Sequence, residues 1–508
     1  MANARSYNVF YPWVQQDDFL TNWANFIEHK NIDWLRDWFW VTLWPKMNKQ
    51  LFTGTKEMLA IYSNQNSGGT LTDTLVWGAS WNIYYLNSTD NIPEFALIVN
   101  YSGVWDVNVA ITNIELLKGF YYIFYKQNYA DSLLWCARIS QFDARTGNWM
   151  AMVKNYIKSW IWLANSWIPP IIQFDNALYV WSGTGILKVD GNYTPGSATL
   201  PWANVFGFPE DVVTWLSLQG TTVVVYTRQG TVYFWDGVDT TYQAVKKFGA
   251  RVQKVGSKAG TDYVITEDGQ FSIWGGLQFF RVTKPKKSNR MNSNVNYDSR
   301  LKFNVDADNA SQNHTVIPAL DDMYMYSSDT VKWIYKYGKL IPWMPDGFHK
   351  IITQNHAGTQ IDFIYDMFFY EIDSRKLYIS YKAGSTYWID YIDLNTLQTS
   401  IDGYFITDVF TWWSNIKKKV IGMQMTTSNT AWNNFVKLYY RVNNWAWELI
   451  RTYNEPTNVI TQDDIKTING QNFKHFIDIQ FKVEIHNDTG GQDAPQVHDL
   501  ALIYDITE

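Results

Sequence analysis

Residues Thr221–Gly237 read TTVVVYTRQGTVYFWDG, and this stretch decides the fold class. Two runs of β-branched and aromatic residues flank a short polar turn that ends on Gly230. Runs of this kind favour β-strands, and a glycine between them supplies the positive φ that tight hairpin turns require. The stretch therefore predicts a β-hairpin.

The same hairpin pattern recurs on both sides of this stretch. Asn176–Gly191 reads NALYVWSGTGILKVDG, and Asp262–Gly276 reads DYVITEDGQFSIWGG. The turn glycines Gly185, Gly230 and Gly269 are 45 and then 39 residues apart. A strand-built repeat of about 40 residues has the length of one four-stranded β-propeller blade.

Looser copies of the hairpin flank these three units. Together the copies predict about six to seven blades, within the usual range of about 4–8 for propellers. The looser copies are Leu75–Tyr85, Ala137–Gly147, Met323–Trp333 and Trp388–Thr396.

The two ends of the chain follow other patterns. Phe19, Trp23, Phe26 and Ile27 recur at roughly helical spacing, which predicts short helices between Asp17 and Trp38 in an otherwise irregular N-terminal segment. Residues 413–508 carry longer strand-like runs with longer connections, as in a β-sandwich. We therefore expect an all-β chain in three parts: an irregular or helical segment (1–54), a β-propeller (55–412) and a β-sandwich-like domain (413–508).

The composition favours a protein that makes large contacts with other subunits. Tryptophan, tyrosine and phenylalanine number 27, 33 and 28 in 508 residues, whereas only 18% of the residues are charged. Aromatic residues dominate the cores of protein–protein interfaces. A Trp-rich internal core is the alternative interpretation of the same numbers.

Charge and cysteine content exclude several classes. The formal net charge of −6 argues against a general nucleic-acid coat, which needs a strong basic excess. The single cysteine, Cys136, permits no intrachain disulfide or cysteine-based metal cage, and it suits folding in a reducing cytoplasm. The first 15 residues lack a signal-peptide pattern, and no apolar run is long enough to insert into a membrane.

Four stretches resemble a class of tailed-bacteriophage virion proteins. Near the N-terminus the stretch is NIDWLRDWFWVTL (Asn31–Leu43). In the C-terminal part the stretches are VKLYYRVNNWAWELI (Val436–Ile450), FIDIQFKVEI (Phe476–Ile485) and APQVHDLALIY (Ala494–Tyr504). Their succession is similar to phage tail proteins of the β-propeller type, found in the tail nozzle or hub.

This resemblance implies a structural role in the virion. The expected partners are further copies in a ring that extends the DNA ejection channel, other tail proteins, transiting double-stranded DNA and the host surface. The protein would be made in the host cytoplasm and end in the phage tail. The alternative function is a receptor- or glycan-binding tail module, with exposed tryptophans that stack on sugars.

A propeller glycoside hydrolase is the third and weakest hypothesis. Thr266–Trp274 reads TEDGQFSIW and departs from the sialidase-type turn motif, because Asp268 and Gly269 are adjacent. Paired carboxylates at a set separation cannot be recognised in the sequence. No catalytic residue and no cofactor is therefore expected.

The sequence also does not match the metal-binding patterns of EF-hands or zinc sites. Counted as an EF-hand loop from Asn304, the sixth position is Asn309 rather than glycine and the twelfth is Thr315 rather than glutamate. The neighbouring Asp321 and Asp322 give no further support, and the seven histidines lack zinc-site spacing. A solvated loop is the favoured interpretation, and no metal is expected.

One basic stretch is a candidate contact for DNA or an acidic partner. It runs from Arg281 to Arg290 and contains Pro285, with Lys417–Lys419 as a smaller companion. A charge run without interleaved aromatic residues is more often a solvated loop than a nucleic-acid site. Its candidate contact residues are Arg281, Lys284, Lys286, Lys287 and Arg290.

Overall fold

The structure is a computed structural model of the whole 508-residue chain. The residues that it describes are 3–6, 26–30, 32–33, 42–43, 47–54, 58–65, 71–78, 82–87, 94–100, 110–126, 133–145, 152–162, 170–181, 185–189, 204–207, 213–258, 260–266, 271–275, 278–281, 316–319, 322–327, 333–338, 347–352, 354–370, 376–394, 402–407, 418–442, 445–455, 461–465, 475–476, 478–488 and 494–506.

The described chain is all-β apart from one short helix, and seven of its sheets are four-stranded and antiparallel. The helix is α1 (Gln141–Arg145). The first four sheets contain β6 (Met58–Gln65), β7 (Leu71–Gly78), β8 (Asn82–Asn87) and β9 (Glu94–Asn100); β10 (Ala110–Leu117), β11 (Phe120–Lys126), β12 (Leu133–Ser140) and β13 (Val153–Trp162); β14 (Ile171–Phe174), β15 (Ala177–Trp181), β16 (Gly185–Val189) and β17 (Asn204–Gly207); and β18 (Val213–Gln219), β19 (Thr222–Thr227), β20 (Thr231–Trp235) and β21 (Ala244–Lys247).

The other three of the seven four-stranded sheets follow. They contain β22 (Val252–Lys258), β23 (Thr261–Thr266), β24 (Phe271–Gly275) and β25 (Gln278–Arg281); β26 (Val316–Ala319), β27 (Asp322–Ser327), β28 (Trp333–Gly338) and β29 (Gly347–Ile352); and β30 (Phe363–Tyr370), β31 (Lys376–Ala383) and β32 (Thr386–Asp393) together with β5 (Met47–Gly54).

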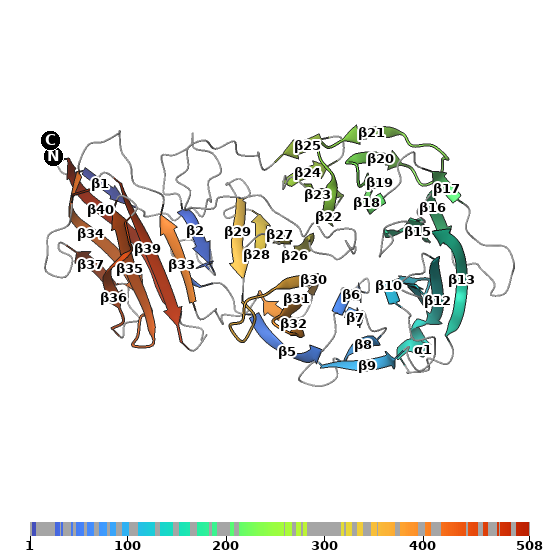
Figure 1. Cartoon of the computed structure of the whole chain (residues 1–508), viewed down its shortest axis with the longest axis horizontal. Helices are drawn as coiled ribbons and strands as arrows, with labels where there is room; N and C mark the ends of the chain where they lie inside the picture. The colour runs from blue at the N-terminus through green and yellow to red at the C-terminus, as the bar shows by residue number, and fades with distance from the viewer. Residues whose placement is uncertain are drawn as a thin grey trace.

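These seven sheets lie around a ring (Figure 1). The first strands of neighbouring sheets contact one another at β6–β10, β14–β18, β18–β22, β22–β26, β26–β30 and β30–β6. The second and third sheets share a core in which Leu117 and Tyr122 pack with Leu178 and Val180. Apolar side chains also fill the space between the third and fourth sheets, where Tyr179 packs with Val225 and Trp235.

The repeated hairpins of the sequence are the two middle strands of successive sheets. They form β15–β16, β19–β20 and β23–β24. The β19–β20 turn contains Gly230 at a φ of 84°. A Cβ at this position would lie 2.4 Å from the carbonyl oxygen of Ala250, so both the backbone conformation and the close approach require glycine.

The seventh sheet is completed from the other end of the chain. β5 pairs antiparallel with β32, with Trp388 opposite Thr53 and Tyr391 opposite Asn48. Met47 is 4% exposed and packs in a core cluster with Ile379 and Ile392. Residues 47–54 thus belong to the ring. The sequence, in contrast, predicts that they belong to an N-terminal segment of residues 1–54.

A second unit consists of two five-stranded sheets at one side of the ring (Figure 1). The first sheet has the order β1 (Asn3–Ser6), β40 (Gln496–Ile506), β34 (Lys418–Ser428) and β37 (Thr461–Ile465), with β38 (His475–Phe476) also paired to β34. The second has the order β2 (Phe26–Lys30), β33 (Asp402–Thr407), β39 (Ile479–Asn487), β35 (Asn434–Val442) and β36 (Glu448–Tyr453). We call these ten strands the C-terminal unit.

The N-terminal segment supplies strands to both units. β1 pairs with β40 and β2 with β33, whereas β3 (Ile32–Asp33) and β4 (Thr42–Leu43) form a small ladder of their own. Where the sequence predicted helices, residues 26–30 and 32–33 are strands, because pairing with distant strands overrides weak local periodicity. Residues 7–25 lie outside the described part. β33 also lies in the C-terminal unit, although the expected boundary assigned it to the propeller.

Five of the seven first strands have a β-bulge near their start. The pairing register shifts at Met58/Ala60, Ile111/Asn113, Val213/Trp215, Val252/Lys254 and Ile364/Asp366. A bulge bends a strand and increases its twist. The repeated position indicates that the same bend shapes these five strands where they line the centre of the ring.

Candidate functional site

One candidate site is a buried carboxylate that lies between two sheets of the ring and accepts several hydrogen bonds. Asp262, on β23, is fully buried. Its Oδ2 accepts hydrogen bonds from Ser217 Oγ at 2.6 Å, Gln219 Nε2 at 2.9 Å and the Tyr226 hydroxyl at 2.5 Å. Its Oδ1 accepts one from Ser257 Oγ at 2.6 Å. Four donors therefore converge on one carboxylate.

This network joins two neighbouring sheets. Ser217, Gln219 and Tyr226 belong to β18 and β19, whereas Asp262 and Ser257 belong to the next sheet. Burial raises the pKa of Tyr226, and the nearby Asp262 carboxylate raises it further. Hydrogen bonds to an ionised group are stronger than neutral ones, and the carboxylate has no access to a substrate. Its role is to hold the sheets together.

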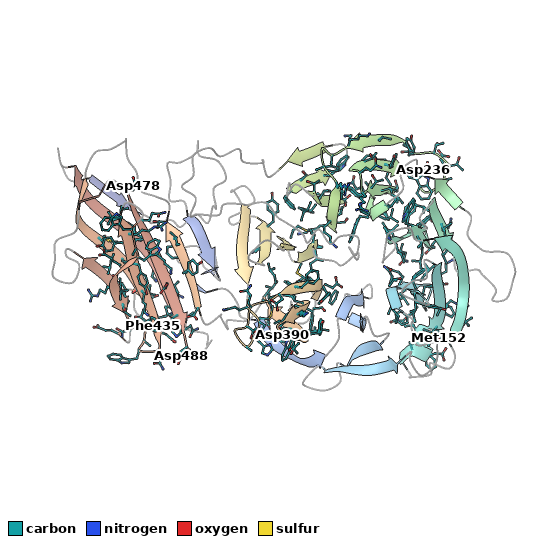
Figure 2. All side chains as sticks on the ribbon, viewed as in Figure 1. Met152, Asp236, Asp390, Phe435, Asp478 and Asp488 are labelled. Atoms are coloured by element: carbon teal, nitrogen blue, oxygen red, sulfur yellow. The ribbon has the colours of Figure 1, made fainter. Side chains whose placement is uncertain are left out.

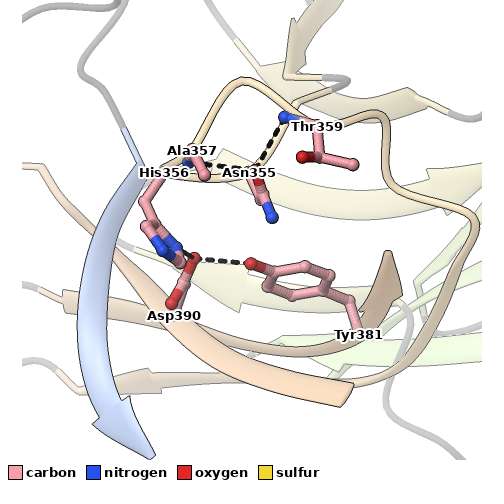
Figure 3. Close-up of polar contacts among 6 residues, drawn as sticks. All are labelled: Asn355, His356, Ala357, Thr359, Tyr381 and Asp390. Carbon is pink, nitrogen blue, oxygen red and sulfur yellow. Dashed lines mark hydrogen bonds and ion pairs between the residues drawn. The ribbon is translucent and has the colours of Figure 1, made fainter. Parts of the chain in front are cut away.

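A second buried carboxylate lies in the sheet that β5 completes. Asp390 Oδ2 contacts His356 Nδ1 at 2.5 Å and accepts a hydrogen bond from the Tyr381 hydroxyl at 2.6 Å (Figure 3). Asn355 Oδ1 accepts hydrogen bonds from the backbone N–H groups of Ala357 and Thr359, which closes the loop that carries His356.

This second cluster does not have the connectivity of a catalytic triad. A triad needs the histidine between the carboxylate and the nucleophile. Here His356 and Tyr381 both contact the same oxygen of Asp390, so the imidazole does not accept the tyrosine proton. The His356 ring also packs edge-on against Trp388 at 4.9 Å. The cluster fixes the loop before β30 to the sheet behind it.

Opposite charges also occur on the first strands at the centre of the ring. Lys254 on β22 and Asp366 on β30 each follow a bulge, and Asp366 is fully buried. Burial lowers the pKa of Lys254 to about 8, whereas the attraction of Asp366 raises it. The two groups partly offset the cost of burying each other's charge.

A rigid loop presents apolar side chains at the outer edge of the ring. Asp236 Oδ1 accepts hydrogen bonds from the backbone N–H groups of Val238 and Asp239, both at 2.9 Å. These hydrogen bonds, that of Asp239 first, lower the pKa of Asp236. Val238 is 78% exposed, and Tyr242 and Val245 are also exposed. We call Val238, Tyr242 and Val245 the outer patch; Asp236 beside it lies far from the C-terminal unit (Figure 2).

The C-terminal unit exposes a tryptophan at each end of β35. Trp432, 70% exposed, lies in the turn between β34 and β35, where Ala431 and Asn434 exchange two backbone hydrogen bonds. Trp445, 74% exposed, follows the other end of β35. These side chains are candidates for binding because tryptophan is enriched in protein interfaces.

The predicted basic stretch can be placed only at its first residue. Arg281 is the last residue of β25, and Lys284, Lys286, Lys287 and Arg290 lie outside the described residues. The loop considered for calcium binding is also mostly outside the described part. Residues 304–309 are not described, whereas Asp322 is the first residue of β27. Cys136 is buried, and burial raises the pKa of its thiol.

Within the described residues, no group of three or more histidine, cysteine, aspartate or glutamate side chains is placed to hold a metal ion. In the same ranges, no helix has the length and apolar character needed to cross a membrane.

Comparisons with known proteins give only distant structural likenesses. No family model matches the chain, and no curated protein sequence matches it. Among solved structures, the computationally designed Ika8 protein has a TM-score of 0.38 and 10% identity, over 69% of this chain and 100% of that one. BBS1N in complex with ARL6DN, soaked with lead, has a TM-score of 0.37 and 12% identity, over 69% and 99%.

The buried tyrosines predict a loss of stability at alkaline pH. Burial and a neighbouring carboxylate raise the pKa of both Tyr226 and Tyr381, whereas an unfolded tyrosine titrates near pH 10. Above about pH 10 the unfolded chain releases these protons and the folded chain keeps them. Stability should therefore fall as pH rises, by about 1.4 kcal/mol per pH unit per tyrosine.

Urea unfolding between pH 8 and pH 11 tests this prediction, with phenolate absorbance recorded in parallel. Some tyrosines should ionise only as the protein unfolds. Ionisation of all tyrosines near pH 10 in a protein that stays folded would contradict it.

Proposed function

We propose that this protein is a structural component of a bacteriophage tail, a nozzle or hub subunit that assembles into a ring around the DNA ejection channel. In this proposal the seven-sheet ring is a seven-bladed β-propeller closed by β5, and the C-terminal unit is a β-sandwich. The propeller comprises residues 47–394, and the sandwich comprises β33 and residues 418–506 with β1 and β2.

The observation that carries the proposal is the path of the N-terminal segment. β1 and β2 are built into the two sheets of the C-terminal unit, and β5 is built into the ring. Pulling the units far apart would load the antiparallel ladders at the ends of this segment. The segment therefore ties the two units together, which suits a part that transmits load.

The outer patch supports assembly with other copies. The loop that carries it is fixed by Asp236, by the hydrogen bond from Trp235 Nε1 to the carbonyl of Asp239, and by the contact of Tyr242 with Tyr233 at 4.9 Å. A preorganised apolar surface loses little entropy on binding. Buried carboxylates that act as ties between sheets, rather than as open sites, also favour a structural role.

Mass photometry and negative-stain imaging of the purified chain test the proposal. We expect a closed ring with a central channel and a mass that is a whole multiple of 59.3 kDa. The double substitution Val238→Glu with Val245→Glu should break the ring, since two charges would enter an apolar contact. Phe142→Glu, at another exposed apolar side chain, is the matched control. A monomer at every concentration tested would contradict ring assembly.

A second candidate function, receptor or glycan binding, is favoured by one observation. Trp432 and Trp445 expose large aromatic rings at the ends of the C-terminal unit. A discrete monomer or trimer that binds sugar would support this function over the nozzle or hub role.

A further inference from the structure

A serine and a histidine of the C-terminal unit meet where the end of β34 faces the start of β40. Ser428 is the last residue of β34, and it lies opposite Gln496, the first residue of β40. Ser428 Oγ donates a hydrogen bond to Gln496 Oε1 at 3.0 Å and lies 2.8 Å from His498 Nε2. One hydroxyl therefore has an imidazole nitrogen and an amide side chain within hydrogen-bonding distance.

A β-bulge gives His498 its place beside the serine. The pairing register of β34 and β40 shifts between Thr426 and Thr427, and His498 is the extra residue on β40. Bulges re-aim side chains and are over-represented beside active sites. The imidazole at this position reaches diagonally across the two strands to Ser428.

The three side chains lie just below the surface of the unit. Ser428 is 3% exposed, whereas Gln496 and His498 are half-buried. A substrate therefore reaches the serine past these two side chains. The low exposure of the hydroxyl limits the reacting group to a small one.

We propose that Ser428 and His498 hydrolyse small carboxylic esters, such as acetyl esters. A serine hydroxyl becomes a nucleophile when a base within hydrogen-bonding distance takes its proton, and histidine is the most frequent such base. The amide group of Gln496 also carries N–H donors of the kind that stabilise the oxyanion of a tetrahedral intermediate. Nucleophile, base and oxyanion donor thus lie together on two paired strands.

The reaction proceeds through an acetyl-enzyme. Ser428 Oγ attacks the carbonyl carbon of the ester while its proton passes to His498 Nε2. The C–O bond to the alcohol breaks, and the alcohol leaves with that proton. Water then attacks the acetyl carbon and gives a proton to His498, which returns it to Ser428 Oγ as acetic acid is released. Overall, an ester and water become a carboxylic acid and an alcohol.

The side-chain contacts are not needed to hold the two strands together. β34 and β40 lie side by side (Figure 1), and their backbone ladder runs from Lys418 opposite Ile506 to Ser428 opposite Gln496. Asp262, in contrast, joins two sheets that no backbone ladder connects. The inference goes beyond the proposed structural role and does not depend on ring assembly.

Two measurements on the full chain test the proposal. A fluorophosphonate probe reacts covalently with activated serines, and peptide mapping by mass spectrometry locates the adduct. We expect the probe to label Ser428. We also expect hydrolysis of p-nitrophenyl acetate that saturates with substrate.

Substitutions assign the activity to the three side chains. Ser428→Ala should remove the saturable hydrolysis, and His498→Asn should lower its rate at least about 100-fold, the usual contribution of a general base. Gln496→Glu keeps an acceptor oxygen but removes the N–H donors, so it should also lower the rate. Thr430→Val is the matched control, because it removes a nearby buried hydroxyl that donates to the carbonyl of Glu455. This variant should keep the parent rate, and circular dichroism checks that each variant is folded.

Three outcomes would overturn the proposal. They are no labelling of Ser428 in the parent protein, saturable hydrolysis that persists in Ser428→Ala, and an unchanged rate in His498→Asn. The labelling result stands even where a variant does not fold. A protein that hydrolyses the ester as a monomer would contradict ring assembly and leave this inference intact.

Discussion

Replacing Asp262 with alanine is expected to lower the free energy of unfolding by about 4 kcal/mol. The substitution leaves the hydroxyls of Ser217, Tyr226 and Ser257 and the amide of Gln219 without their shared acceptor in a buried or half-buried position. Each buried polar group that loses its partner costs about 1–3 kcal/mol, and local rearrangement recovers part of the sum. Urea unfolding followed by intrinsic fluorescence measures the change.

The matched control for Asp262→Ala is Asp402→Ala. Asp402 also contacts a side chain, that of His486, but it is largely exposed. Exposed ion pairs contribute about 1 kcal/mol or less, so this variant should unfold near the parent. If the two aspartate variants lost equal stability, Asp262 would not be the tie between sheets that the geometry indicates.

Replacing Met47 with aspartate is expected to cost at least about 4 kcal/mol and to release the N-terminal segment. Met47 is buried against Ile392 and the core of the seventh sheet. A carboxylate there would lie among the apolar side chains of this cluster, and burying a charge in such surroundings is among the most damaging substitutions. Unfolding in urea and limited proteolysis near residue 55 measure the effect.

Met47→Leu provides the volume-matched control. A hydrophobic substitution of similar size usually costs less than about 1.5 kcal/mol, so this variant should resist the protease as the parent does. A stable, protease-resistant Met47→Asp protein would mean that β5 does not close the ring.

The repeated hairpins could be predicted from sequence because their signals are local. In Thr221–Gly237 the strand formers and the turn glycine are adjacent in the chain, and the structure forms β19 and β20 from them. The partners of β1, β2 and β5 are some 300 to 500 residues away, as with Ala4 and Ile503. Local periodicity contains no information on such pairings, so it predicts helices where residues 26–30 and 32–33 form strands.

The candidate sites were less predictable than the hairpins. Asp262 stands out only as an aspartate at the start of an apolar strand, and three of its four donors, Ser217 among them, come from the preceding repeat. The register shift before Lys254 leaves no mark in the sequence, because a bulge changes pairing and not composition.

The central claim is that the N-terminal segment is built into both units, and engineered disulfides test it most directly. Asn48 lies opposite Tyr391 in the ring, and Ala4 lies opposite Ile503 in the C-terminal unit. Facing Cα atoms of antiparallel strands are about 4.5–5.5 Å apart, within the range that a disulfide spans. Asn48→Cys with Tyr391→Cys, and Ala4→Cys with Ile503→Cys, are the two test pairs.

Mild oxidation followed by disulfide mapping with mass spectrometry gives the readout. Both pairs should form intramolecular disulfides in high yield. The exchanged pair, Ala4→Cys with Tyr391→Cys, should form none, because its members lie in different units. Failure of both test pairs, or equal cross-linking of the exchanged pair, would contradict the claim that the N-terminal segment is built into both units.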